Sequence, residues 1–413
     1  MSLLGSVGGV GRAGRVLLRH RLISATAGTA AAVIVAGCAF ASAHASSQEN
    51  VVNAGDSKRI TQPSHSAAPA AKITPLRLLS VSPAGGTHDV NGGGPVTLTF
   101  SSALAPATPL PTLSPKIAGS WKVSGATATF TPTSGYLPDT KVKVTVPAGM
   151  AGAASSAGTL GKASSASFTT GAYSTLGLQQ LLTQLGYLPL TWTPTSTSTS
   201  TGATDSTLTS MNQAVSTAYA PQDGAFAFKP GYPSQLTSQW KTGQDNMLDQ
   251  GAIRAFENNE GLTMDGVAGP QVWADLLTAA AKNQVNPNGY SYALASQDSP
   301  HESLKVWHNG KLILNTPVNT GIAGDSTADG TFPVYERLQY QVMKGTNPDG
   351  SKYADPVYWI SYFNGGDAVH YFDRGSYGWY QSLGCVELQW NPAKFIWPYL
   401  TYGTLVTVTG PVA

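Results

Sequence analysis

Cys385 is the residue of this chain best suited to nucleophilic chemistry. It lies in the segment Ser382-Leu383-Gly384-Cys385-Val386-Glu387, and His370 precedes it by 15 residues. The chain has one other cysteine, Cys38, which falls in a segment typical of export signals. An unpaired thiol in an exported protein, with a histidine nearby in the sequence, is a candidate nucleophile.

Length and composition narrow the classes of protein to consider. The 413 residues suggest two to four domains, and 41% hydrophobic residues are enough for packed cores. The net charge is only +2, with no basic stripe after the N-terminal arginines, so we expect no nucleic-acid partner. No group of His, Cys, Asp and Glu has metal-ligand spacing, so we expect neither a metal nor another cofactor.

Residues 1–45 have the pattern of an export signal. Four arginines precede an apolar stretch, Leu22–Gly37, which is marginal for a membrane helix of about 20 residues. The segment Val35-Ala36-Gly37-Cys38 resembles a lipobox, in which Cys38 would carry a lipid. Ala43-His44-Ala45 fits ordinary cleavage instead, and an uncleaved anchor is the third alternative. We expect a protein of the cell envelope, lipid-anchored outside the cytoplasmic membrane and touching the membrane only through its N-terminus.

The next two segments differ sharply in pattern. Residues 46–74 are polar and aperiodic, as in a flexible linker. Residues 75–172 contain short alternating runs separated by Gly, Pro and Ser turns, which predicts an antiparallel β-sandwich. The runs are 78–83, 96–100, 126–132, 141–146 and 166–170. The segment resembles a bacterial immunoglobulin-like domain, and without a titratable cluster we interpret it as a spacer or wall-contact module.

A helical period begins at about residue 174 and ends near 285. Leu178, Leu181, Leu182 and Leu185 lie on one helix face, and Gly186 is the expected cap. With the helical run 252–257, the Asp265-Gly-Val-Ala-Gly-Pro270 segment and Trp273, this pattern resembles the three-helix peptidoglycan-binding domain. That resemblance implies glycan or peptide binding, although a small bundle can equally be a scaffold.

An insertion at about 190–245 departs from that family, which joins these helices by a short loop. The insertion is either a disordered loop or a local elaboration of the bundle. No core can be built from its Thr- and Ser-rich part, residues 191–209. Four aromatic residues farther along favour packing of the remainder: Phe226, Phe228, Tyr232 and Trp240.

Residues 288–413 return to a strand pattern. The runs 304–307 and 311–314 flank Asn309-Gly310, a strong hairpin signal. Further strands are expected at 358–363, 368–370 and 405–409. The predicted fold is therefore multidomain and mainly β: an immunoglobulin-like sandwich, a small helical bundle and a β-rich C-terminal domain.

The C-terminal segment resembles the L,D-transpeptidase catalytic domain, the YkuD family. The family signature is a His, a spacer of roughly 14 to 17 residues, and then Ser/Thr-His-Gly-Cys followed by an apolar residue. This sequence supplies His370, Ser382, Gly384, Cys385 and Val386.

The resemblance implies a specific chemistry. Cys385 would attack the third residue of a peptidoglycan tetrapeptide stem and expel its terminal D-alanine. An amine of a second stem would then resolve the thioester, giving a 3→3 cross-link. His370 would act as base and then as acid, and the backbone N–H groups of Leu383, Gly384 and Cys385 would form the oxyanion hole. The expected partners are peptidoglycan stem peptides, and carbapenems are expected to acylate the thiol.

Three positions depart from the family pattern. Leu383 stands where the family has His, Glu387 where it has Arg or Asn, and Tyr371 where Gly or Ser is common. Candidate substrate contacts are Tyr358, Tyr362, Tyr371, Ser382 and Glu387; any aromatic residue on the inward side of a strand would instead belong to the core.

The departures keep other functions open. One alternative is a non-catalytic wall-binding protein with a degenerate transpeptidase domain. Another retains the acyl chemistry but uses it for hydrolysis, or to attach a protein to the wall.

Overall fold

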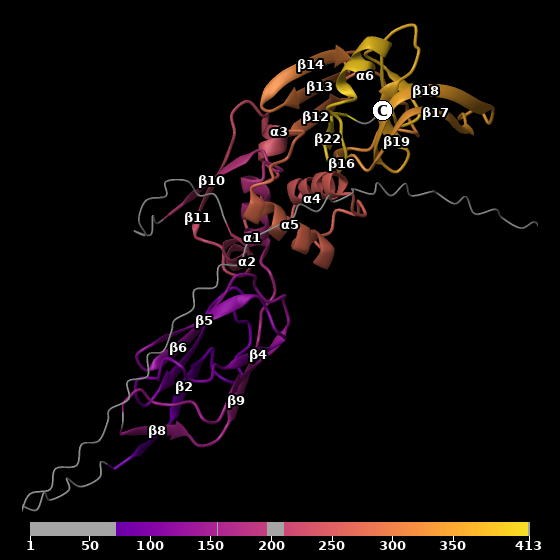
Figure 1. The fold of residues 1–413 in the computed structure, drawn as a ribbon. Coiled ribbons are helices and arrows are strands. Elements are labelled where there is room, and N and C mark those ends of the chain that lie inside the picture. The colour runs from indigo at the N-terminus through magenta and orange to yellow at the C-terminus, as the bar shows by residue number, and fades with distance from the viewer. Residues whose placement is uncertain (1–71, 155, 196–209, 412–413) are drawn as a thin grey trace, which may run out of the picture. The chain divides into compact units, whose positions relative to one another are not determined.

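The computed structural model describes residues 72–154, 156–195 and 210–411 (Figure 1). The predicted export signal with Cys38, nearly all of the predicted linker and residues 196–209 of the insertion lie outside the described residues. Within the described ranges, no helix combines the length and the apolar character needed to cross a membrane.

The N-terminal part of the described chain is a β-sandwich. One sheet has the order β2 (Leu78–Ser82), β3 (Val96–Phe100), β6 (Thr127–Pro132), β5 (Gly119–Ser124). The other has β4 (Thr112–Ser114), β7 (Lys141–Val146), β9 (Ser164–Thr169), while β1 (Thr74–Leu76) pairs with β8 (Ala157–Leu160).

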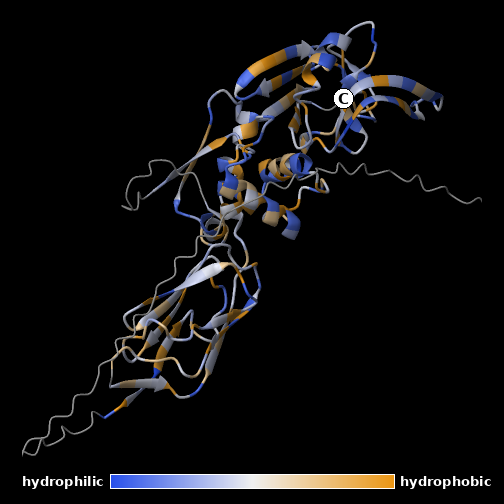
Figure 2. Cartoon of the chain, viewed as in Figure 1, coloured by the Kyte–Doolittle hydropathy of each residue, from blue (hydrophilic) through white to orange (hydrophobic). Residues whose placement is uncertain are grey.

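The five strands expected from the alternating runs are present as β2, β3, β6, β7 and β9. Their alternate apolar residues, among them Leu98, Val142 and Val144, fill the core between the sheets. The alternation of hydropathy along these strands is visible in Figure 2. The predicted sandwich is therefore confirmed.

The helical part contains α1 (Thr175–Gln184), α2 (Met211–Tyr219), α3 (Ser234–Thr237), α4 (Met247–Glu260) and α5 (Pro270–Lys282). Ser174 caps α1 through its Oγ, which accepts a hydrogen bond from Gly177 N at 2.9 Å. Gly186 follows the end of α1 with φ 75°, the left-handed conformation expected of a terminating glycine. The apolar faces form one buried cluster that also takes in Tyr292 and Trp307 of the C-terminal sheet.

The described part of the insertion is an elaboration of the bundle. It contributes α2, α3 and an antiparallel pair of strands, β10 (Leu190–Pro194) with β11 (Gly224–Phe228). The expectation that its aromatic residues pack is confirmed: Phe226, Phe228, Tyr232 and Trp240 all lie against the helical core. The Phe226 ring lies 5.0 Å from that of Trp240.

Two sheets build the C-terminal part. The larger has the order β14 (Lys311–Pro317), β13 (Ser303–His308), β12 (Ser291–Ser296), β22 (Leu405–Thr409), β16 (Gly330–Pro333). The smaller has β17 (Glu336–Thr346), β18 (Lys352–Asn364), β19 (Asp367–Tyr371), β21 (Val386–Leu388). The short strands β15 (Thr320–Gly321) and β20 (Tyr380–Ser382) pair with each other, and α6 (Trp390–Ile396) follows β21.

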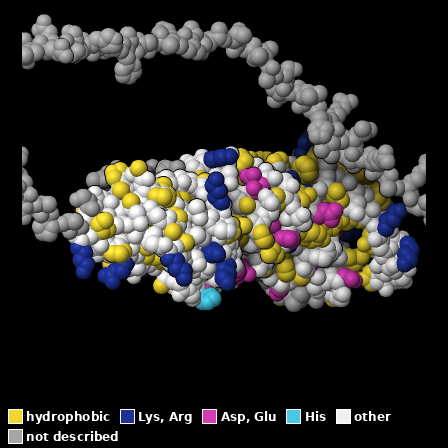
Figure 3. All heavy atoms as spheres, turned by 60° about the horizontal axis from the view of Figure 1, so that its bottom comes forward, with side chains coloured by type: hydrophobic (Ala, Val, Ile, Leu, Met, Phe, Trp, Pro, Cys, Tyr) yellow, Lys and Arg dark blue, Asp and Glu magenta, His cyan; other side chains and the backbone are white. Residues whose placement is uncertain are grey.

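The predicted hairpin at Asn309-Gly310 joins β13 to β14. Both residues have positive φ, 48° and 77°, as a tight hairpin turn of this type requires. A buried cluster drawn from both sheets and α6, including Val306, Val386 and Ile396, forms the core of this part. On the face drawn in Figure 3, most side chains are neutral, and Lys, Arg, Asp and Glu side chains are interspersed among them.

Candidate active site

The candidate site and the main core lie on opposite faces of the smaller sheet. Strands β19 and β21 run parallel, with His370 opposite Glu387 and Val369 opposite Val386. The two valines belong to the main core. Since neighbouring residues of a strand point to opposite faces, His370 and Glu387 lie on the other face of the sheet.

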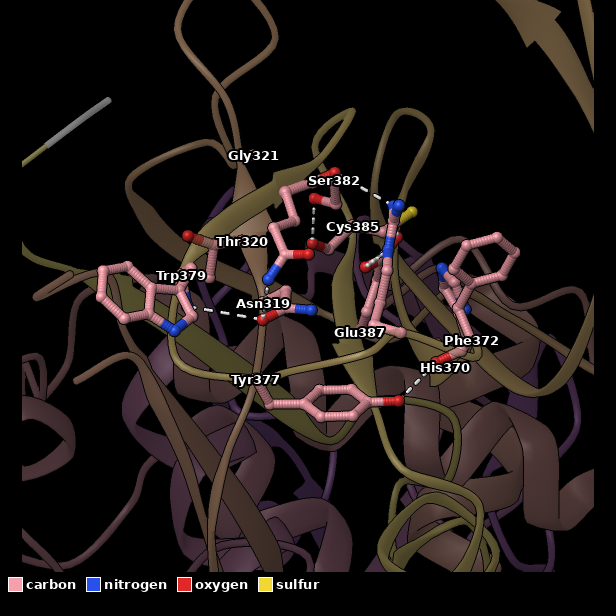
Figure 4. A network of polar contacts seen from close by, with 12 residues as sticks. Asn319, Thr320, Gly321, His370, Phe372, Tyr377, Trp379, Ser382, Cys385 and Glu387 are labelled. Carbon is pink, nitrogen blue, oxygen red and sulfur yellow. Dashed lines mark hydrogen bonds and ion pairs between the residues drawn. The ribbon is translucent and has the colours of Figure 1, made fainter. Parts of the chain in front are cut away.

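Cys385 lies immediately before β21, on the same face as His370. It packs in a small separate cluster with Ala368 of β19 and with Met343 and Tyr362 of the β17–β18 hairpin. The side chain is partly exposed, and its Sγ donates to Gly366 O at 3.7 Å. The structure therefore brings the two predicted catalytic residues onto one sheet face, on adjacent segments (Figure 4).

The thiol of Cys385 is protonated at neutral pH. The pKa of the Cys385 thiol is raised to about 12, mainly by burial of the sulfur and in smaller part by the carboxylates of Glu387 and Asp367. The backbone N–H of Ala368 acts in the opposite direction and lowers this pKa. Nucleophilic attack consequently requires a base that removes the proton as the sulfur reacts.

His370 has the protonation state that such a base needs. Its ring is buried, with 2% of the residue exposed, and burial lowers the pKa of His370 below its usual 6.5. Nδ1 lies 2.9 Å from Tyr371 O, a carbonyl that can only accept, so the proton is assigned to Nδ1. Nε2 then carries the lone pair and is available to take a proton.

The thiol and the imidazole are not joined by a hydrogen bond in this state. Among the described residues, the partner of Cys385 Sγ is Gly366 O and that of His370 Nδ1 is Tyr371 O. Catalytic hydrogen bonds are often long or absent before substrate binds. Rotation of the Cys385 side chain away from Gly366 would free the thiol proton for transfer.

The turn that carries Cys385 has the features of an oxyanion hole. Gly384 has φ 103°, and Ser382 Oγ donates to Cys385 O at 2.6 Å, which fixes the turn. Among the hydrogen bonds of the described residues, none is donated by the backbone N–H of Leu383, Gly384 or Cys385. These three donors are thus available to an oxygen that develops negative charge.

Glu387 does not present a carboxylate at the mouth of the site. The residue is 4% exposed, and its two oxygens accept from Arg374 Nε at 2.8 Å and Arg374 Nη2 at 2.7 Å. The carboxylate is therefore neutralised inside the protein. Leu383, the other departure next to Cys385, is half-buried.

Two domains of the chain match known families. Residues 72–170 match the family model described as a bacterial Ig-like domain. Residues 291–408 match the family model of the L,D-transpeptidase catalytic domain, YkuD. The C-terminal domain belongs to this L,D-transpeptidase family. A comparison with curated protein sequences gave no match.

Solved structures similar to this chain are themselves L,D-transpeptidases. One from Mycobacterium smegmatis shares 15% identity over 82% of this chain and 100% of its own, with a TM-score of 0.27. L,D-transpeptidase 3 from Mycobacterium tuberculosis shares 12% identity over 81% and 98%, with a TM-score of 0.27. The catalytic domain of the E. faecium enzyme shares 25% identity over 29% and 96%, with a TM-score of 0.27. The assignment of the domain rests on the family models.

The tyrosines predicted to contact substrate lie on different faces of the transpeptidase sheet. Tyr362 packs in the Cys385 cluster. Burial is the main cause that raises the pKa of Tyr362 to about 12, and a negative charge on Cys385 contributes to the shift. Tyr371 alternates with His370 and faces away, and its ring lies 5.0 Å from that of Trp390. The Tyr358 ring lies 5.2 Å from that of Trp390, so Tyr358 and Tyr371 are not brought together with the thiol.

Two residues next to the candidate site were not predicted. Arg374 pairs with Glu387, and Asp367 lies beside Gly384, where a Cβ added to the glycine would be 2.4 Å from Asp367 Oδ1. A signal for the Arg374 pair exists, because Glu387 stands between Val386 and Leu388 in a buried strand and needs a cation. Arg374 is the only Lys or Arg in the spacer between His370 and Cys385. No comparable sequence signal identifies Asp367.

Gly384→Ala is expected to impair the transpeptidase turn. The φ of 103° is unfavourable for alanine, and its Cβ would approach Asp367 Oδ1 to 2.4 Å. We expect a loss of about 1–3 kcal/mol of unfolding free energy and a fall in the rate of Cys385 acylation, both measurable on the purified protein. Gly186→Ala is the matched control, since Gly186 also has positive φ but open space around its Cβ. An equal loss of acylation in both variants would contradict this role of Gly384.

Among the described residues, no group of three or more His, Cys, Asp and Glu is arranged to hold a metal ion. The groups that these segments offer for chemistry are the thiol of Cys385, the imidazole of His370 and the backbone N–H groups of residues 383–385.

Proposed function

We propose that this protein is a peptidoglycan L,D-transpeptidase that forms 3→3 cross-links through Cys385. The observation that carries the proposal is the placement of three parts within a YkuD-family domain. A neutral buried imidazole, a thiol and three free backbone N–H groups lie on adjacent segments at one sheet face. These are the parts that acyl transfer to a thiol requires.

In the first half-reaction, His370 Nε2 takes the proton of the Cys385 thiol as the sulfur attacks the carbonyl carbon of the third stem residue. The carbonyl oxygen becomes an oxyanion held by the N–H groups of residues 383–385. The C–N bond to the terminal D-alanine then breaks, and the proton on His370 passes to the leaving amine. The product is a thioester between the stem and Cys385.

In the second half-reaction, a side-chain amine of a neighbouring stem attacks the thioester carbonyl. The amine gives up a proton to His370 as the C–S bond breaks, and this proton returns to the sulfur. The new amide joins the third residues of two stems. With water as the attacking group the same steps hydrolyse the stem, and with a protein amine they attach that protein to the wall.

Substrate contacts follow from the residues around the thiol. Tyr362, Tyr353 and Tyr335 all lie close enough to Cys385 for a charge on its sulfur to raise their pKa values. We propose that the donor stem lies between these tyrosines and the Ser382–Cys385 turn. Tyr358, Tyr371 and Glu387 take no direct part in this arrangement.

The remaining parts of the chain fit a wall-directed enzyme. We propose that residues 1–45 export the protein, with Cys38 lipid-anchored, that the immunoglobulin-like domain spaces the catalytic domain from the membrane, and that the helical bundle contacts peptidoglycan. Mass measurement of the mature N-terminus tests the anchor, since the absence of a lipid on Cys38 would contradict it.

A second candidate is a wall-binding protein whose transpeptidase domain has lost activity. Three observations favour it: the high pKa of the Cys385 thiol, the missing hydrogen bond to His370, and Leu383 in place of a histidine. Carbapenem acylation separates the two candidates. Transpeptidases similar to this chain were captured with imipenem and with a faropenem-derived adduct. We propose the same reactivity for Cys385, and no adduct would favour the inactive candidate.

Product analysis tests the proposed reaction itself. The purified protein is incubated with a disaccharide-tetrapeptide, and the products are measured by mass spectrometry. The proposal predicts free D-alanine and a 3→3 dimer. Release of D-alanine with only a shortened monomer would indicate hydrolysis instead, and intact substrate would contradict catalysis.

A further inference from the structure

Two groups hold the ends of the turn that carries Cys385. The turn runs from Ser382 to Cys385, between the end of β20 and the start of β21. On its upstream side, Arg374 Nη2 donates to Gln381 O at 3.0 Å. On its downstream side, the same guanidinium donates to both oxygens of Glu387, at 2.7 and 2.8 Å. One side chain therefore spans the turn and links its two ends (Figure 4 shows the network).

The geometry of this link is rigid. The Glu387 side chain is 6% exposed and that of Arg374 29%, so water competes little for the pair. A guanidinium binds a carboxylate through two parallel hydrogen bonds, which fixes orientation as well as distance. The guanidinium also lies 4.6 Å from the centre of the Phe372 ring, which restricts it further.

Asn319 holds the downstream end from a different side. Its backbone exchanges two hydrogen bonds with Glu387, at 3.0 and 2.9 Å. Its side-chain Oδ1 accepts from Gly378 N at 3.1 Å, and from Gln381 Nε2 at 3.3 Å. The backbone of Glu387 is thus held by Asn319 and its side chain by Arg374.

We propose that Arg374 and Glu387 act as one positioning unit that holds the N–H groups of residues 383–385 in place for the transition state. This inference rests on the proposed function. In the proposed reaction, neither Arg374 nor Glu387 touches the reacting atoms. Both act through the backbone of the turn, and Glu387 stands at the position where the family has Arg or Asn.

The pairing also explains why a carboxylate is tolerated at position 387. Glu387 lies opposite His370 in the sheet register and raises the pKa of Cys385. Other ionised groups facing this region are the Asp367 carboxylate and Arg374 itself. Without the guanidinium, an isolated buried carboxylate beside the site would oppose formation of the thiolate.

The test compares Arg374→Gln, Glu387→Gln and the double variant, with D-alanine release giving kcat and KM. We expect each single substitution to lower kcat about 10- to 100-fold with little change in KM, because the N–H groups act in the transition state. The double variant is expected to be no slower than the slower single variant, since residues that act as a unit are not additive.

Alkylation of Cys385 by iodoacetamide at fixed alkaline pH gives a second readout that needs no substrate. Glu387→Gln removes a negative charge and should speed alkylation, whereas Arg374→Gln leaves the carboxylate unneutralised and should slow it. A fall in kcat together with faster alkylation in Glu387→Gln cannot result from weaker thiol ionisation, and it is the signature of lost positioning.

Arg337→Gln is the matched control. Arg337 also lies over an aromatic ring, 4.2 Å from the centre of Trp397, and donates to a backbone carbonyl. It should keep its kcat even where it lowers thermal stability. If either amide variant fails to fold, Arg374→Lys and Glu387→Asp replace it. Arg374→Lys keeps the charge and loses the bidentate contact, so it should lower kcat and leave alkylation unchanged.

Additive losses in the double variant, or single variants with unchanged kcat, would overturn the proposal. If the wild-type protein releases no D-alanine, the proposed function fails. The positioning role in transpeptidation then falls with it. The alkylation readout is independent of that function, because opposite shifts in the two single variants support a charge-coupled pair beside the thiol and equal shifts refute the coupling.

Discussion

Cys385→Ser is expected to lower the rate of acylation, by a stem peptide or by a carbapenem, on the order of 10³-fold or more. Serine is close in size to cysteine, so it should fit among Ala368, Met343 and Tyr362 without disturbing the fold. A hydroxyl is a much weaker acid and nucleophile than a thiol.

The loss is measured as the rate of adduct formation by intact mass spectrometry. Thermal unfolding of wild type and variant serves as the control for folding. A variant that keeps more than about a tenth of the wild-type rate, while folded, would show that the acyl group is carried elsewhere.

His370→Asn is expected to lower acylation about 10²- to 10⁴-fold at neutral pH, the usual contribution of a general base. The asparagine amide can still donate to Tyr371 O, as Nδ1 does at 2.9 Å, so the local structure should survive. Asparagine has no group that can accept the thiol proton. The variant therefore separates the base function of His370 from its place in the fold.

The pH dependence of acylation gives a second expected result. A base must be unprotonated to act, and burial lowers the pKa of His370 below 6.5, so wild-type acylation should rise through a midpoint below pH 6.5 and then level off. Without the base, reaction depends on free thiolate. Because the pKa of Cys385 is raised to about 12, the rate of His370→Asn should keep rising into the alkaline range.

His308→Asn is the matched control for this experiment. His308 is a half-buried histidine of the same domain, and burial lowers its pKa as it lowers that of His370. Its Nδ1 lies 3.0 Å from Ser291 Oγ. Its replacement should leave the pH profile unchanged. If the acylation rate of His370→Asn still rises through the same midpoint below pH 6.5, the base is a group other than His370.

Where local pattern and burial agreed, the sequence was sufficient to predict the fold. The Asn309-Gly310 hairpin, the alternating strands of the sandwich and the leucine face of α1 were all predicted, because each depends on residues close together in the chain. Strand β12 was missed since, in the middle of its sheet, it is buried on both faces and shows no alternation.

Strand β17 was missed for another reason. Its partner β18 was predicted in part, and the Asn347-Pro348-Asp349-Gly350 segment between them is a recognisable turn signal. The β17 sequence itself mixes charged and apolar residues because much of the strand is exposed. Because β17 was not predicted, the sequence did not indicate that the β17–β18 hairpin packs beside Cys385.

For the candidate site, the sequence predicted a pair of residues more readily than the arrangement around them. The spacing of His370 and Cys385 singled out both as candidates, and the structure places them on one sheet face. The burial of the Glu387 carboxylate depends on its ion pair with Arg374. Arg374 lies in a loop, which has no periodic pattern from which its position could be predicted. Tyr358 and Tyr371 lie on a different sheet face from Tyr362. Strand alternation alone would place Tyr358 and Tyr362 on the same face, but a β-bulge in β18 between them shifts the alternation.

The central claim, that Cys385 carries the acyl group of a stem peptide, is tested most directly by trapping that intermediate. The protein is mixed with a tetrapeptide stem in the absence of an acceptor, quenched in acid and mapped by mass spectrometry of its peptides. We expect the mass of the shortened stem on the peptide that contains Cys385, with release of one D-alanine for each acyl group. Release of D-alanine without that mass, or an acyl group on a different residue, would contradict it.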